Sequence, residues 1–436
     1  MLIFIHFLIG LLSSAFIVIQ LSKRRALPSL WLWSMTILFM SVFPIFFLNG
    51  WIHEQRQFSH LTVDEYKHFF NISSAVTFIF FIIFSGFYIL SYKKFPIRLF
   101  AFSRFKSDKN VAIAFVLIGL LALFLFIQSY GGLGYVLMNI SSIRSGTAEV
   151  KSYFGSTAKL FSVYIDFSLF LLFLMHLDKK WHRESLRWIR VSFYCVMALV
   201  LFRAFLAGSR GGVIFIFISL YFCYIFYVGR FVLKKEMIFL FLFAVFFIVY
   251  GKSYIFQILR NPESEFKLAS SLMPVVLEVV SEYHYVYLSL VNTLVEDCLG
   301  CRFFGDFTYW AFKPLHFFGV EYPDSVSYFN TFLANGQWTS DIPPGVLAFS
   351  VMQGGVAVIP VAAGVLGTFM GAMDKVFVNS WRKFSKIDIV IWMYFSLNVT
   401  SVFFNSDLAL IIQTNLPFIV LLLVLILARR VRFFKF

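Results

Sequence analysis

The chain has 436 residues, of which 60% are hydrophobic and only 14% are charged. A soluble domain needs more polar surface than this composition provides, so the sequence excludes a soluble globular protein and indicates an integral membrane protein. The net charge of +15 is strongly positive, so the distribution of the basic residues along the chain is informative.

Long apolar runs recur along the chain and predict membrane-spanning helices. Each run holds about 17 to 25 residues, which as a helix matches a hydrocarbon layer about 30 Å thick. We therefore predict an all-α polytopic membrane protein with about 11 transmembrane helices. The predicted spans are 2–21, 29–49, 71–91, 110–130, 157–177, 190–208, 211–228, 236–251, 344–370, 387–404 and 408–427.

The basic residues are concentrated in alternate loops, and this pattern predicts the orientation of the chain. Loops rich in Lys and Arg stay in the cytoplasm, so we expect the N-terminus outside and the C-terminus inside. The net charge then reflects topology, with anionic inner-leaflet lipid as the neighbour, and gives no reason to expect a nucleic-acid partner. The basic segments, which hold 25 of the 37 Lys and Arg residues, are SKRRALP, YKKFPIRLFAFSRFKSDKN, DKKWHRESLRWIR, GRFVLKKE, MDKVFVNSWRKFSK and ARRVRFFKF.

One outer loop is far longer than the others and divides the chain into three regions. Residues 252–343 form a 92-residue outer domain with ten carboxylates against five Lys or Arg, between spans 1–8 (1–251) and spans 9–11 (344–436). Loops of this length usually carry function. Apolar residues at helical spacing predict at least one amphipathic helix in it. These residues are Leu268, Leu272, Val276, Val279, Tyr283, Val286 and Leu290.

Aromatic residues crowd the second half of this loop. Such rings stack on sugars, and they also form the interfacial belt of membrane proteins, so both interpretations stay open. The residues are Phe303, Phe304, Phe307, Tyr309, Trp310, Phe312, Tyr322, Tyr328 and Trp338.

Two of the four cysteines, Cys298 and Cys301, lie in this loop within the sequence CLGC. A bridge across so short a loop gains little chain entropy, and no His or further Cys lies nearby to complete a zinc site. The spacing favours a local disulfide or two free thiols over redox catalysis.

The stretch LAGSRGGVIF places Arg210 at the outer turn between the sixth and seventh spans. Its small neighbours Gly208, Ser209 and Gly211 expose backbone N–H groups at the start of a helix. An arginine beside such a turn predicts a site for an anionic oxygen, especially a phosphate. The alternative is an arginine that snorkels at the membrane edge.

Arg203 lies seven residues before Arg210, so the two arginines share a helix face and one of them lies within the membrane. An intramembrane arginine is a candidate functional residue, and Arg203 is included among the candidate diphosphate ligands. Asp166 is predicted at a comparable depth in the fifth span. We expect Arg203 to pair with Asp166 and Arg210 to remain for a ligand.

Three further arginines, Arg144, Arg260 and Arg302, lie in predicted outer loops and could converge on the same anion. Converging arginines suit a diphosphate, because they stabilise the charge that builds on a departing phosphate oxygen without a metal. The chain has no HExxH, DxD, P-loop or GxSxG pattern. These absences exclude the common metallohydrolases, DxD nucleotide-sugar enzymes, NTPases and serine hydrolases.

A transfer reaction at a sugar carbon also needs a base for the incoming hydroxyl. Glu278 and Glu282 are spaced to share a helix face, whereas His284 points elsewhere and could pack among tyrosines. Asp341 precedes a predicted helix and could serve its N-terminus instead. The outer candidates are Glu278, Glu282, His284, Asp306, His316, Asp324 and Asp341.

The order of these features resembles a family, the Wzy-type O-antigen polymerases of bacterial surface polysaccharide. The similar pieces are GSRGG (208–212) at the head of a helix, the large outer loop, and TSDIPPGVLAFSVMQGGVAVIP (339–360). The last segment also resembles the enterobacterial common antigen polymerase. Arg144 and Gly155 match the spacing of arginine, ten residues and glycine found in outer loops of some members, and the second copy of that spacing is missing.

The resemblance implies a metal-independent glycosyltransferase of the membrane C type that uses no cofactor. Such proteins, in the bacterial inner membrane, move a growing glycan from undecaprenyl diphosphate onto an incoming lipid-linked repeat unit at the periplasmic face. It implies that Arg210 and Arg144 bind the diphosphate, that Arg260 and Arg302 assist, and that an outer-loop carboxylate or His is the base. A chain-length regulator in the same membrane is the implied protein partner.

Two other functions compete with this one. An O-antigen ligase shares the topology and attacks the same diphosphate bond with a lipid A-core acceptor, but it typically carries a His just before the helix that follows the large loop, where this chain has TSDIPPG. A lipid-linked oligosaccharide flippase would show charges lining a central cavity and no 92-residue outer domain. Both differences favour the polymerase.

Overall fold

The protein is described by a computed structural model. The described residues are 2–23, 25–50, 58, 60–95, 98–102, 108–144, 158–178, 183–206, 210–230, 232, 285–312, 325–336, 342–427 and 431–435. The predicted span 236–251 and most of the predicted amphipathic stretch of the outer loop lie outside these residues.

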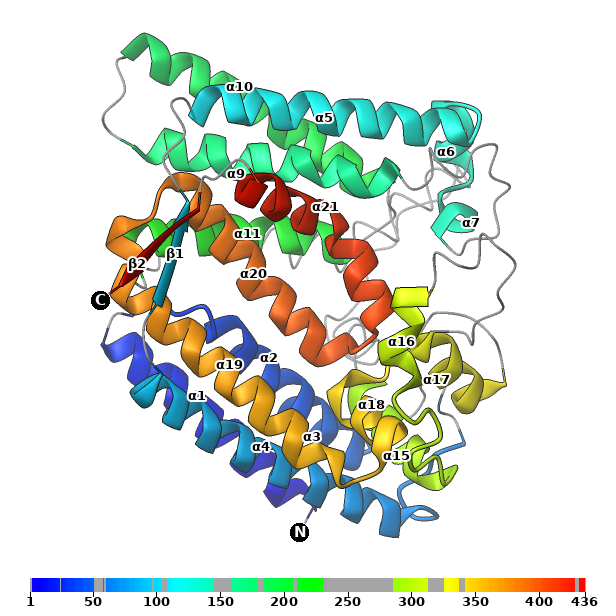
Figure 1. Cartoon of the computed structure of the whole chain (residues 1–436). Coiled ribbons are helices and arrows are strands. Elements are labelled where there is room, and N and C mark those ends of the chain that lie inside the picture. The colour runs from blue at the N-terminus through cyan, green and yellow to red at the C-terminus, as the bar shows by residue number, and fades with distance from the viewer. Residues whose placement is uncertain are drawn as a thin grey trace, which may run out of the picture. The chain divides into compact units, whose positions relative to one another are not determined.

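The chain divides into two compact units, each built mainly of helices (Figure 1). Unit 1 comprises residues 1–97, 270–379 and 395–413, and unit 2 comprises residues 98–269, 380–394 and 414–436. The elements of unit 1 are α1 (Leu2–Ser22), α2 (Leu30–Ile37), the π-helical segment η1 (Leu38–Val42), α3 (Phe43–Leu48), α4 (Lys67–Lys94), α15 (Tyr285–Val295), α16 (Gly305–Phe312), α17 (Val326–Asn335), α18 (Gly345–Gly354) and α19 (Val358–Ser380). Those of unit 2 are β1 (Arg98–Phe102), α5 (Asp108–Ser129), α6 (Leu133–Met138), α7 (Ile140–Arg144), the 3₁₀ segment η2 (Lys159–Val163), α9 (Tyr164–Leu177), α10 (Arg183–Leu206), α11 (Arg210–Val228), the 3₁₀ segment η5 (Trp381–Lys383) and β2 (Val431–Lys435). Helices α20 (Lys386–Asn405) and α21 (Leu408–Leu427) contribute to both units.

Within the described residues, eight helices are long and apolar enough to cross a membrane. Seven of the predicted spans coincide with such helices to within a few residues, which confirms a polytopic, mainly helical membrane protein. The predicted spans 211–228 and 408–427 are helices α11 and α21, although their described apolar stretches, Phe215–Val228 and Thr414–Leu425, are shorter. The eight spanning helices are Leu2–Ser22, Leu30–Leu48, Lys67–Lys94, Asp108–Ser129, Lys159–Leu177, Arg187–Leu206, Val358–Lys383 and Lys386–Asn405.

The predicted span 344–370 is wrong, because the structure breaks it into α18 and α19. Gly355 adopts a φ of 72°, a conformation open to glycine but costly for other residues, and it ends α18 by donating its N–H to the Val351 carbonyl (2.8 Å). Every described residue of α18 from Gly345 to Gln353 is buried. The spanning helix is therefore α19, and α18 is a short buried helix that precedes it.

In unit 1, α19 packs closely on α4 through glycine. Cβ atoms on Gly367 and Gly371 would overlap the carbonyl oxygens of Phe84 and Tyr88 on α4. Small residues allow this approach, which supplies the van der Waals contact that holds membrane helices together.

A buried carboxylate ties the segment before α2 to this helix pair. Asp374 of α19 accepts hydrogen bonds from the Ser29 N–H (3.0 Å), the Ser29 hydroxyl and the Tyr88 hydroxyl (2.5 Å). A buried carboxylate is costly unless it is hydrogen-bonded, so three donors to one group stabilise the chain in this arrangement.

A second buried network joins α1, η1, α4 and α15. His6 Nδ1 donates to the Met40 carbonyl (2.7 Å), which leaves Nε2 to accept from the Ser74 hydroxyl (3.0 Å), and the Tyr287 hydroxyl lies 2.8 Å from Ser74 Oγ. Met40 lies in the π-helical segment, whose wider turn changes the direction of its carbonyls. The network therefore fixes α15, a helix of the predicted outer loop, against the spanning helices of unit 1.

In unit 2, α9 is the central helix. It packs against α5, α10 and α11, and its residues from Tyr164 to Met175 are all buried. The close contact with α5 depends on Gly119, where a Cβ would overlap Ile165, and on the Ser168 hydroxyl, which donates to the Ala112 carbonyl (2.9 Å).

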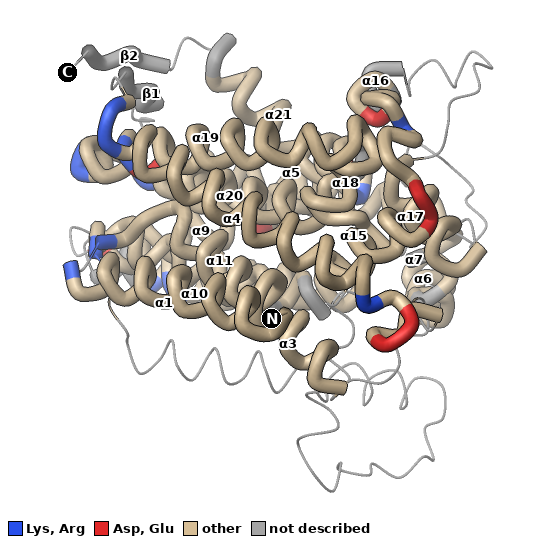
Figure 2. The backbone as a smooth tube through the Cα atoms, turned by 90° about the horizontal axis from the view of Figure 1, so that it is seen from below, with Lys and Arg blue, Asp and Glu red and all other residues tan. Residues whose placement is uncertain are grey.

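The segments predicted to face the cytoplasm contact one another within each unit. In unit 2, β1 and β2 pair antiparallel with Arg98 opposite Lys435, and Lys386 Nζ lies 2.9 Å from Asp108 and 3.2 Å from Asp178. In unit 1, Lys375 donates to the Lys93 carbonyl. Figure 2 shows Lys and Arg mostly at helix ends, which agrees with helices that cross a membrane.

Candidate functional site

Arg210 is the first residue of α11, as the sequence predicts. The preceding Gly208 and Ser209 lie outside the described residues, and Gly211 is the second residue of the helix. The first N–H groups of an α-helix have no partner within the helix and favour an anion. The position of Arg210 therefore suits an anion site at the start of α11.

Arg203 binds Asp166, which confirms that predicted pair. Arg203 Nη2 donates to Asp166 Oδ2 at 2.5 Å, from the last turn of α10 to the first turn of α9. The Asp166 side chain is 3% exposed and the Arg203 side chain 20%. Among the described residues, Arg203 Nε and Asp166 Oδ1 have no hydrogen-bond partner, so the pair is only partly saturated.

Lys159, which the sequence analysis missed, adds a second cation to this end of unit 2. It lies within electrostatic range of Arg203, and its Nζ stands 5.0 Å from the centre of the Phe126 ring. Two cations thus lie within electrostatic range of each other, and one of them, Arg203, is paired with Asp166. The signal in the sequence is a lysine at the outer end of a span, against the bias that keeps basic residues in the cytoplasm.

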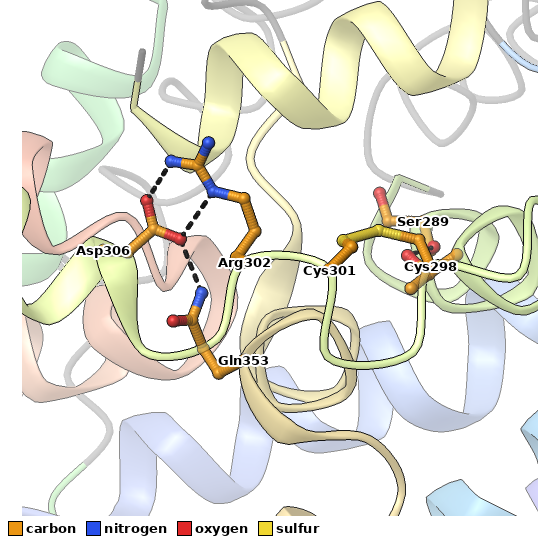
Figure 3. Close-up of a disulfide and its surroundings, with 7 residues drawn as sticks. Ser289, Cys298, Cys301, Arg302, Asp306 and Gln353 are labelled. Atoms are coloured by element: carbon orange, nitrogen blue, oxygen red, sulfur yellow. Dashed lines mark hydrogen bonds and ion pairs between the residues drawn. A yellow bond between two sulfur atoms is a disulfide. The ribbon is translucent and has the colours of Figure 1, made fainter. Parts of the chain in front are cut away.

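Arg302 and Asp306 bind each other in unit 1. Arg302 Nη2 donates to Asp306 Oδ1 (2.5 Å) and Nε to Oδ2 (3.1 Å), and the Gln353 amide of α18 donates to the same Oδ2 (2.5 Å; Figure 3). Arg302 also stands 5.1 Å from the centre of the Phe329 ring. The three donors engage both oxygens of the Asp306 carboxylate. The geometry favours a structural role for both residues.

Cys298 and Cys301 form a disulfide, one of the two states that the sequence left open (Figure 3). The bridge closes the turn that leads from α15 to Arg302. Backbone bonds fasten this turn to α18: the Gly300 N–H donates to the Val351 carbonyl and the Arg302 N–H to the Met352 carbonyl, both at 2.9 Å.

A group of polar side chains connects α15 and α17, and it too was missed. His60 Nε2 donates to Asn292 Oδ1 (2.8 Å), and the Asn330 amide donates to the Ser289 hydroxyl (3.0 Å) and to the Ile342 carbonyl (2.9 Å). These residues lie far apart along the chain and follow no motif, so the sequence offers no signal for them.

The remaining candidates are only partly placed. Arg144 ends α7, but its side chain is not among those described. Arg144, Arg203, Arg210 and Arg260 belong to the range of unit 2, whereas Arg302 and Asp306 belong to unit 1. Glu278, Glu282, His284, Asp341 and Arg260 lie outside the described residues.

Metal ligation finds no support in the described part of the chain, where no three His, Cys, Asp or Glu side chains gather in a way that could hold an ion. Comparisons with protein-family models, with curated proteins and with solved structures gave no match to this chain.

Proposed function

We propose that this protein polymerises undecaprenyl-diphosphate-linked O-antigen repeat units at the periplasmic face of the bacterial inner membrane. The observation that carries the proposal is Arg210 at the start of α11, an apolar helix of a polytopic membrane protein. An arginine at a helix N-terminus in such a protein suits a membrane-bound substrate whose charge is a diphosphate. The resemblance of the GSRGG stretch and of the segment 339–360 to O-antigen polymerases supports the same function.

In the proposed reaction, the hydroxyl on the non-reducing end of a new repeat unit attacks the anomeric carbon of the growing glycan. The new C–O bond forms as the bond from that carbon to the diphosphate oxygen breaks. Undecaprenyl diphosphate leaves with the electron pair, and the hydroxyl proton passes to a base of the outer loop. Arginines stabilise the charge of the leaving group and need no metal for this purpose.

We assign Arg210 and Arg144 to the diphosphate, with Arg260 assisting. We assign Arg203 a secondary role in diphosphate binding. One of its donors binds Asp166, while its Nε has no partner among the described residues. The base is assigned to Glu278, Glu282, His284 or Asp341. Arg302 and Asp306 are left out of the reaction, since they bind each other.

The proposal is tested with surface lipopolysaccharide from a strain that lacks the gene and carries wild type, Arg210→Ala, Arg210→Lys or Arg187→Ala. We expect Arg210→Ala to lower the bands above one repeat unit by about 100-fold, because removing one donor to the transition-state charge costs that much. Arg210→Lys should retain short chains, since it keeps the charge and loses the fork of donors. Arg187, exposed on α10, is the control and should give the full ladder.

Protein amounts in the membrane, compared by immunoblot, show that each variant is inserted. A full ladder with Arg210→Ala would remove Arg210 from the site. If the strain without the gene loses every O-antigen band, including core plus one repeat unit, the protein is a ligase or a flippase and the proposed function is wrong.

A further inference from the structure

The turn between α15 and α16 presents two neighbouring phenylalanines to the outside. Phe303 is 79% exposed and Phe304 45%, and Leu299 in the same turn is 50% exposed. Burying an apolar side chain is favourable, and within the described structure about half or more of the surface of each of these three side chains stays uncovered. We call residues 298–305 the aromatic turn.

The backbone of the aromatic turn is strained. Phe303 and Phe304 have φ values of 32° and 58°, in the left-handed region that bulky residues rarely adopt. Asp297, just before the turn, has a φ of 50°. Strained residues persist only where the surroundings hold them, and they cluster at functional positions.

Covalent and polar contacts hold the turn in this conformation. The disulfide closes it at its start, two backbone hydrogen bonds fasten it to α18, and Arg302 binds Asp306, which also accepts a hydrogen bond from Gln353. The Arg302–Asp306 pair is buried, with side chains 10% and 4% exposed, whereas the two phenylalanines are exposed. The chain thus maintains an unfavourable backbone conformation, and this conformation presents two exposed phenylalanine side chains.

The position of the turn indicates what covers these rings. Phe304 packs over Gly354, where an added Cβ would lie 3.4 Å from the tip of its ring, and four residues later Val358 starts the spanning helix α19. Val356 is 42% exposed, and Val361 and Val365 on α19 are 64% and 62% exposed. Exposed apolar residues on a spanning helix face lipid. The aromatic turn adjoins this lipid-facing surface at the level where α19 begins.

We propose that the aromatic turn is a membrane anchor, which inserts Phe303 and Phe304 into the interfacial layer of the outer leaflet beside α19. The occupant of this apolar surface is bilayer lipid. Through α18 and α15, the anchor fixes the depth of the outer-loop helices of unit 1 relative to the bilayer. Aromatic side chains at this level are typical of membrane proteins, and here a strained, disulfide-closed turn supplies them.

The test labels the full-length wild-type protein in lipid nanodiscs with a diazirine that partitions into the lipid, and in parallel with a water-soluble diazirine. Mass spectrometry then locates the labelled residues. Val361 and Val365 are the internal reference for lipid, and Glu296 and Asp297, both exposed at the end of α15, are the reference for water.

We expect the lipid-phase reagent to label Phe303 and Phe304 as strongly as Val361, and on the order of 10-fold more than Glu296. If the water-soluble reagent labels the two phenylalanines as strongly as Glu296 while the lipid-phase reagent does not, the phenylalanines face water and are accessible to sugar rings. This result would disprove the membrane anchor. If neither reagent reaches them while both references react, another protein surface covers them and the proposal also fails.

Discussion

At the scale of single residues, two of the five arginines expected at a diphosphate site are seen bound to aspartates. Arg203 binds Asp166 in unit 2, at the end of α10 that is predicted to face outward, and Arg302 binds Asp306 in unit 1. The two pairs differ in the hydrogen-bonding atoms that remain without a partner. Asp306 is also held by Gln353, whereas Asp166 has one oxygen without a partner among the described residues. A ligand would therefore meet unsatisfied groups at the first pair and a saturated carboxylate at the second.

The Arg203–Asp166 pair predicts an asymmetric response to mutation. Arg203→Gln leaves a buried carboxylate without its cation and should lower the free energy of unfolding by about 3 kcal/mol. Asp166→Asn leaves a partly exposed arginine without its partner and should lower the free energy of unfolding by about 2 kcal/mol. The double variant should cost at least about 1 kcal/mol less than the sum, because neither residue is then left alone. Thermal unfolding in detergent gives these values, with Arg187→Gln as an exposed control on the same helix. Additive losses would show that the pair contributes nothing.

At the scale of elements, hydropathy predicts where helices lie and fails to show where an apolar stretch is interrupted. Seven of the predicted spans are confirmed because about 20 apolar residues between polar ends leave one solution in a membrane. The stretch 344–370 stays apolar across Gly354 and Gly355, so its hydropathy does not reveal the break that separates buried α18 from α19.

The candidate site follows the same division between local and distant contacts. The pairing of Arg203 with Asp166 could be predicted from equal depth in two spans, and the i,i+4 spacing of Arg302 and Asp306 was available in the sequence. The third partner, Gln353, could not be predicted, because it reaches Asp306 from a helix 47 residues away. The same holds for the buried hydrogen bonds between His6 and Ser74.

The packing of α19 on α4 predicts opposite effects for two glycines. Gly367→Ala places a Cβ against the Phe84 carbonyl and should lower the free energy of unfolding by about 2 kcal/mol through overpacking. Gly86, on the exposed side of α4, has no atom within 4 Å of its Cβ position, so Gly86→Ala should leave stability unchanged or raise it by up to about 1 kcal/mol. Thermal unfolding of both variants in the same detergent compares them. An equal response would contradict close helix contact at Gly367.

At the scale of the whole molecule, the chain keeps its basic residues away from the middle of most spanning helices (Figure 2). Within unit 2, the strand β1 from one predicted cytoplasmic segment pairs with β2 from another. Two segments that pair in a sheet lie on the same side of the membrane, so this contact agrees with the prediction that both segments face the same compartment. In the topology predicted from charge, the 92-residue loop is external and the β ribbon is cytoplasmic.

Paired cysteines at Leu99 and Phe434, which are opposite each other in the ribbon, test that topology. A short bismaleimide should crosslink the double variant Leu99→Cys and Phe434→Cys. The control is the double variant Leu99→Cys and Val431→Cys, whose positions are three residues out of register and which should not crosslink. Prior treatment of spheroplasts with a membrane-impermeant maleimide should not block the reaction, because both strands are expected in the cytoplasm. A block by that reagent would reverse the orientation. Single-cysteine variants control for the native thiols Cys195 and Cys223.

The division of unit 1 into three separate stretches has a consequence for biogenesis. Residues 1–97 enter the membrane first, but their partners in residues 270–379 leave the ribosome only after all of unit 2 up to Ala269 has been made. During that interval His6 and Ser74 lack Tyr287, and the buried Ser29 and Tyr88 lack Asp374. The first helices of unit 1 must therefore lie in the bilayer without their later partners. Until α15 and α19 are inserted, an insertase or a chaperone can shield their unpaired polar groups.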